Sequence, residues 1–171
     1  AGGNVAIYGK SAVNGLTNPA SLNPDGSAWA AGIFTVVGDN KNLSIDSGTG
    51  TILLDGVCVL TQSFGGEGIY LNGATLTSAA TTGTAIMLNG DASAANYGAG
   101  TRGAGVTLVG WSNTQPIDIS ATGGGDISIT GVTTSQAAPW NSGIRVASAG
   151  AGTTSISTTN GGDINLDSTY N

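Results

Sequence analysis

Short units in which two apolar residues flank one other residue recur along the chain, separated by segments rich in Gly, Asn, Ser and Thr. The clearest units lie at residues 5–7, 43–45, 69–71, 86–88, 106–108, 127–129, 144–146 and 164–166. Successive side chains of a strand point to opposite faces, so each unit places both of its apolar side chains on one face. The pattern therefore predicts short β-strands with one buried and one solvent-facing side.

These units also recur at a regular distance. From Ile69 onward their first apolar residues follow one another in steps of 17 to 21 residues. A period of about 20 residues is typical of a solenoid. Weaker units at 51–54, 74–76, 116–119 and 155–157 are candidates for a second or third face. We expect an all-β fold, a right-handed parallel β-helix of seven or eight coils on the order of 35 Å long. An antiparallel sandwich is the alternative, but its turns would recur without the longer period.

The whole chain, residues 1–171, is expected to form a single β-helix segment of a longer rod, because the pattern is already in progress at 3–7 and still running at 163–166. Two interruptions, near 14–31 and 91–104, predict extra-helical loops, and shorter ones lie at 110–116 and 133–142. Insertions in solenoids become loops on the outside, often on the binding face.

Aromatic residues gather in these interruptions, and they supply the candidate binding residues: Trp29, Tyr97, Arg102, Trp111 and Trp140. Exposed aromatic rings can stack on sugar rings or anchor protein contacts. Alternatively, each Trp packs its own loop onto the helix.

The spacing also predicts which side chains fill the core. The inward-facing residues should stack in rows along the axis, and they are Ile69, Leu71, Ile86, Leu88, Val106, Leu108, Ile127, Ile129, Ile144, Val146, Ile164 and Leu166. Asn-Gly pairs begin at Asn14, Asn72, Asn89 and Asn160 and predict tight corners, because both residues accept positive φ at low cost. Glycine pairs before Asp126 and Asp163 predict a corner followed by a strand.

Composition limits the chemistry. The chain has no His, four Lys and Arg, ten Asp and Glu, and a net charge of −6. Catalytic dyads and triads that use His are excluded, and nucleic acid is not an expected partner because phosphate binding needs basic residues. We expect no catalytic site, no metal and no cofactor. Cys58 lies in an apolar run and should be a small buried residue. The chain contains no run of about 18 apolar residues, so no membrane-spanning segment is expected.

Enzymes of this fold use acids on neighbouring coils. Asp118 with Asp126, and Asp163 with Asp167, are the pairs that could serve as acid and base. The alternative is that all four are solvated surface acids.

Three segments carry a family resemblance: GEGIYLNGATLTS at 66–78, GGGDISITG at 123–131 and TNGGDINL at 159–166. They resemble the repeats of filamentous haemagglutinin-like adhesins, and the likeness extends over about residues 33–171. Members of that family are large exoproteins of Gram-negative bacteria, exported by two-partner secretion. The resemblance implies a secreted, outer-membrane-associated protein at the bacterial cell surface, an outer-membrane secretion partner and a role in cell adhesion.

The leading hypothesis is a non-catalytic structural filament, a rigid stalk or fibre of an extracellular adhesin. The expected partners are a receptor or glycan on a host or neighbouring cell and, end to end, a second copy of the chain. Two alternatives remain open: a glycan- or receptor-binding module that uses the loop aromatics, and a carbohydrate-active β-helix enzyme.

Overall fold

The computed structural model describes residues 2–11, 30–35, 42–59, 66–94, 103–134 and 141–171. All regular structure in these residues is β. The strands are β1 (Val5–Ser11), β2 (Ala30–Phe34), β3 (Leu43–Asp46), β4 (Ile52–Cys58), β5 (Gly66–Asn72), β6 (Ala74–Ser78), β7 (Thr84–Ala92), β8 (Gly103–Gly110), β9 (Ile117–Ala121), β10 (Asp126–Thr133), β11 (Ser142–Ser148), β12 (Thr154–Thr158) and β13 (Ile164–Tyr170).

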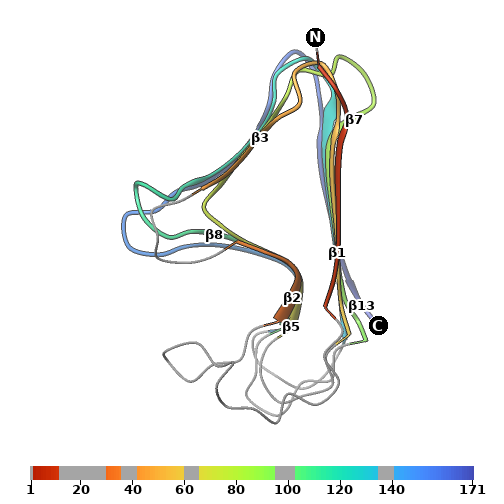
Figure 1. The fold of residues 1–171 in the computed structure, drawn as a ribbon, viewed down its shortest axis with the longest axis vertical. Helices are drawn as coiled ribbons and strands as arrows, with labels where there is room; N and C mark the ends of the chain where they lie inside the picture. Colours follow the sequence, from red (N-terminus) through yellow and green to blue (C-terminus); the bar gives the residue numbers. More distant parts are fainter. Residues whose placement is uncertain (1, 12–29, 36–41, 60–65, 95–102, 135–140) are drawn as a thin grey trace.

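The strands form three parallel sheets that the chain visits in turn. Sheet A has the order β1-β4-β7-β10-β13, sheet B the order β11-β8-β5-β2, and sheet C the order β12-β9-β6-β3. In Figure 1 the strands of each sheet nearly superpose, so the three sheets appear as three walls around one interior. This arrangement is a parallel β-helix, and the predicted fold class is confirmed.

Each coil is about twice as long as expected. Strand partners in sheet A lie 34 to 47 residues apart, since Val5 pairs with Ile52, Ile52 with Ile86, Ile86 with Ile127 and Ile127 with Ile164. The predicted coil of about 20 residues is therefore wrong. The strong units alternate between sheet B and sheet A, so the sequence repeats at half a coil. Strands lie about 4.8 Å apart, and the five strands of sheet A span about 19 Å rather than 35 Å.

The prediction that the weaker units form a separate face of the coil is correct for three of the four units. Those at 74–76, 116–119 and 155–157 lie at strands of sheet C, whereas 51–54 begins β4 of sheet A. The strong unit at 43–45 is β3, a strand of sheet C. Apolar spacing identifies a strand, but it does not show which of the three sheets the strand joins.

Aliphatic rows fill the interior as predicted for the middle coils. The eight predicted residues from Ile69 to Ile129 are fully buried. They stack on their register partners, as Ile86 does on Ile52 and Ile127. Cys58 is also buried, as expected.

The prediction of burial is wrong for the last coil. Val146, Ile164 and Leu166 are 50%, 42% and 55% exposed, and Ile144 is only partly buried. They occupy the same rows as the buried residues, but no strand of the described residues covers them on the far side.

Glycines replace side chains where sheets A and B touch. Gly9, Gly56, Gly90 and Gly131 are register neighbours in sheet A. A Cβ atom on any of them would overlap the backbone of a sheet B glycine: Gly32, Gly68, Gly105 and Gly143 respectively. We call these two sets the glycine ladders. The predicted corner at Asn89 is wrong, because β7 continues to Ala92 and Gly90 serves this close backbone approach.

Other predicted corners are confirmed. Gly73, which follows Asn72, has φ 69°, and Asn160 has φ 60°. Gly124 and Gly161 also have positive φ just before β10 and β13. Asn14 lies outside the described residues. Strands occupy the margins of the two long interruptions, since β2 begins at Ala30, β7 ends at Ala92 and β8 begins at Gly103.

Candidate functional site

Sheet A presents a broad outer face. Its outward side chains form rows that cross all five strands at the strand spacing. One row, here called the tyrosine row, consists of Tyr8, Asp55, Asn89, Thr130 and Asp167. The next, the lysine row, consists of Lys10, Val57, Asp91, Val132 and Thr169. The face therefore carries hydroxyl, amide and carboxylate groups along the axis, with the apolar side chains of Val57 and Val132 between them.

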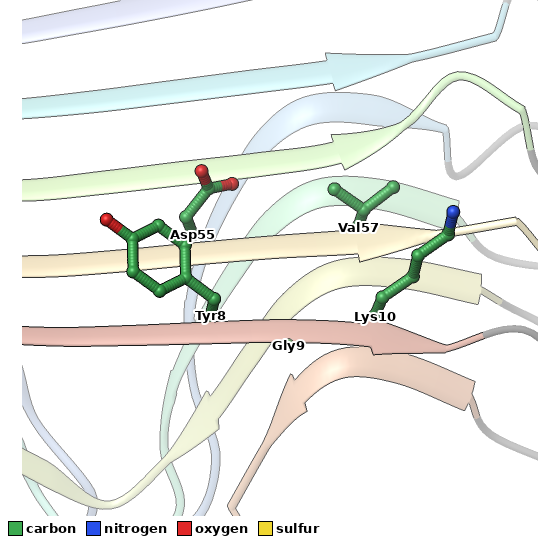
Figure 2. Close-up of a pocket in the computed structure, with 5 residues that line it drawn as sticks. All are labelled: Tyr8, Gly9, Lys10, Asp55 and Val57. Atoms are coloured by element: carbon green, nitrogen blue, oxygen red, sulfur yellow. The ribbon is translucent and has the colours of Figure 1, made fainter.

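A depression of about 200 Å³ lies between these two rows at β1 and β4. Tyr8 and Asp55 form one wall and Lys10 and Val57 the other, with Gly9 at the base (Figure 2). The Tyr8 side chain is 71% exposed. An aromatic ring, a carboxylate and an ammonium group thus surround one open site.

Trp111 is the predicted binding residue that the structure describes. It follows β8 in a turn closed by two backbone hydrogen bonds, from its N–H to Gln115 O (3.1 Å) and from Gln115 N–H to Ser112 O (3.0 Å). Its backbone packs against the turn that contains Gly150 and Gly152 in the next coil. The side chain is 46% exposed, so part of it is open to a partner.

The predicted set is not brought together within the described residues. Trp29, Tyr97, Arg102 and Trp140 lie outside them. Trp111 lies between the end of β8 in sheet B and the start of β9 in sheet C, whereas the depression lies on β1 and β4 of sheet A.

The outer face of sheet B is not the wet surface that the alternation predicted. Every residue of β5 and β8 is buried. Thr107 donates to Glu67 Oε1 (3.0 Å), and the ring of Phe34 stacks on Tyr70 with centroids 5.2 Å apart. The outward side chains of β5 and β8 are therefore packed among other side chains and are not open to solvent.

The acid pairs considered from the sequence are not brought together. Asp118 lies in β9 of sheet C, whereas Asp126 begins β10 of sheet A and accepts a hydrogen bond from Asp163 N (2.9 Å). Asp163 and Asp167 lie about 13 Å apart along one chain direction, farther than glycosidase carboxylates need.

Two general searches cover the described residues alone. They contain no cluster of three His, Cys, Asp or Glu residues arranged to hold a metal ion. They also contain no helix that is long and apolar enough to cross a bilayer.

The fold thus defines the chain as a parallel β-helix with a five-stranded outer face of polar and apolar side chains. No protein-family model matches it, and neither a curated protein nor a solved structure matches it.

The sequence analysis missed the depression. Alternation within residues 5–11 places Tyr8 and Lys10 on the same side of a strand, so the sequence alone could have shown that these two side chains share a face. Asp55 lies 47 residues from Tyr8, and only the register of β1 with β4 brings the two together.

Proposed function

We propose that this β-helix is a non-catalytic structural segment, a rigid stalk or fibre of a secreted adhesin at the bacterial cell surface. The observation that supports this most is the continuous parallel pairing of the five strands of sheet A, which has one register irregularity, between Asp126 and Ile127 at the start of β10. Each strand is hydrogen-bonded to its neighbours, and the aliphatic rows and glycine ladders lock the sheets together. Such a stack resists bending and holds whatever it carries at a fixed distance.

The family resemblance supports the surrounding biology in this proposal. It comprises export through an outer-membrane secretion partner, and adhesion to a receptor or glycan on a host or neighbouring cell. The half-exposed Trp111 favours the second candidate, a binding module that uses turn aromatics. Sustained turnover of a polysaccharide by the protein would contradict both proposals.

Removing one whole coil tests the spacer role. Deleting residues 86–126 joins Ala85 to Ile127, whose partner position is Ile86, and brings Ile127 beside Ile52. The variant should melt cooperatively, be shorter by about 4.8 Å, and leave surface display and adhesion of the parent protein unchanged. Circular dichroism and antibody staining of intact cells measure these outcomes.

The matched control deletes residues 86–105, which is half a coil. It joins Ala85 to Val106 and puts a sheet B strand in the place of a sheet A strand, so it should fail to fold. Equal behaviour of the two deletions would contradict the coil assignment. Lost adhesion in a folded 86–126 deletion would contradict the spacer role.

The two ends of the described stack also fit a further coil. Ile7 at one end and Leu166 at the other are 36% and 55% exposed, and β1 and β13 each have one strand neighbour in sheet A. Unpaired strand edges beside apolar side chains favour association. We propose that a second copy stacks end to end. Sedimentation velocity of the unmodified protein at micromolar concentration should show oligomers. A monomer at every concentration would contradict end-to-end stacking.

A further inference from the structure

The depression on sheet A has the chemistry of a sugar-binding site. Its aromatic wall is the side chain of Tyr8, which is 71% exposed, so one face of the ring is open for stacking. Among the described residues, no hydrogen bond or ion pair engages the Tyr8 hydroxyl, the Asp55 carboxylate or the Lys10 ammonium group. All three polar groups therefore point into solvent with their hydrogen-bonding capacity intact.

The arrangement of these groups fits a pyranose ring better than a peptide or a lipid. A sugar offers C–H groups to an aromatic face and hydroxyls at its rim. Asp55 can accept from two hydroxyls, while Lys10 donates to a third oxygen. Each wall carries a charged group, Asp55 on one side and Lys10 on the other, which disfavours a lipid chain. The volume of about 200 Å³ lies below the range of about 300–1,000 Å³ that drug-sized ligands occupy, which limits the site to one ring.

The two rows extend this site into a line of further contacts. Beyond Asp55, the tyrosine row continues through Asn89, Thr130 and Asp167, one strand after another. The strand spacing of about 4.8 Å is close to the length of one sugar unit in an extended glycan. Amide and hydroxyl side chains donate to and accept from sugar hydroxyls, so each strand offers a contact to the next sugar.

We propose that the outer face of sheet A binds a neutral glycan along the solenoid axis, with one pyranose ring stacked on Tyr8 between Asp55 and Lys10. Asp55 and Lys10 offset each other in charge at the ring site, which suits an uncharged sugar, and the remaining charged residues of the two rows, Asp91 and Asp167, would repel an anionic glycan. This site is independent of the spacer role, since a shaft can bind a glycan along its side. A single ring on a shallow site binds with millimolar affinity, and a longer chain binds more tightly because it covers more strands.

The test titrates the intact protein with neutral β-1,4-linked glucose and N-acetylglucosamine oligosaccharides of two to six units, followed by calorimetry and by NMR of the Tyr8 ring. Affinity should rise with chain length. Tyr8→Ala should weaken binding about tenfold, Tyr8→Phe should retain it, and Asp55→Asn should weaken it. The matched control Asp118→Asn, on the exposed face of sheet C, should have no effect. A thermal melt of each variant confirms its fold.

Three outcomes would overturn the proposal. One is the absence of binding to every neutral oligosaccharide at millimolar concentration. Another is binding that survives Tyr8→Ala but is lost in Trp111→Ala, which would place the glycan at the turn. The third is binding of uronic acid oligosaccharides alone, abolished by Lys10→Ala, which would make the ligand an anion. None of these results bears on the coil deletion, so this proposal and the spacer role fail separately.

Discussion

Replacement of Ile127 by Asp should destabilise the protein by about 4 kcal/mol or more. Ile127 is fully buried between Ile86 and Ile164 in one row of sheet A. The substitution removes an aliphatic side chain and leaves a carboxylate in a site without a counter-ion, since no Lys or Arg is buried among the described residues. We expect the melting temperature to fall by roughly 10 °C.

Ser128→Asp is the matched control for this substitution. Ser128 is the next residue of β10 and faces outward between Met87 and Asn165. The same new charge on a solvent-facing position should change stability by less than about 0.5 kcal/mol. Equal melting temperatures for the two variants would contradict the inward and outward assignment on which the fold depends.

Gly131→Ala should cost about 3 kcal/mol although it adds a single methyl group. The new Cβ atom would overlap the carbonyl group of Gly143, which is backbone rather than the movable end of a side chain. Sheets A and B would have to separate to remove this overlap, and the close contacts of the neighbouring glycine pairs oppose that movement. Urea denaturation gives the loss of stability directly.

Gly3→Ala provides the comparison, because a Cβ atom at Gly3 would meet no other atom within 4 Å. It should leave the midpoint of unfolding unchanged. If Gly131→Ala is as well tolerated as Gly3→Ala, the two sheets do not touch at the ladders.

The strands and the core of this fold were predictable because they depend on local alternation. Ile86 and Leu88, or Ile127 and Ile129, lie two positions apart, and that spacing alone puts both side chains on one face. Because the units stack on one another in a solenoid, the shared face of these side chains was correctly predicted to be buried.

The coil length was not predictable from the same signal. Strands of sheets A and B carry equally strong units, as Ile86-Met87-Leu88 and Val106-Thr107-Leu108 illustrate. The period in the sequence is therefore the distance between two faces rather than one coil. Glycines such as Gly90 were misjudged for a related reason: after Asn89 a glycine suggests a turn, and only the opposite sheet shows that it serves a close backbone contact.

The candidate site required contacts between residues distant in the sequence. Tyr8 and Asp55 come from different coils, so no local motif joins them. Among the aromatic residues proposed from the sequence, the structure describes Trp111 alone, and its exposed side chain was consistent with its position in an interruption of the pattern.

A distance between the two ends of sheet A tests the central claim most directly. Spin labels at Ala6 and Asn165, both outward on the first and last strands of one row, are introduced in a Cys58→Ala background. A rigid, in-register stack predicts a narrow distance distribution centred at roughly 20 Å, four strand spacings. Coils of about 20 residues would instead give about 34 Å, and either that value or a broad distribution would contradict the account.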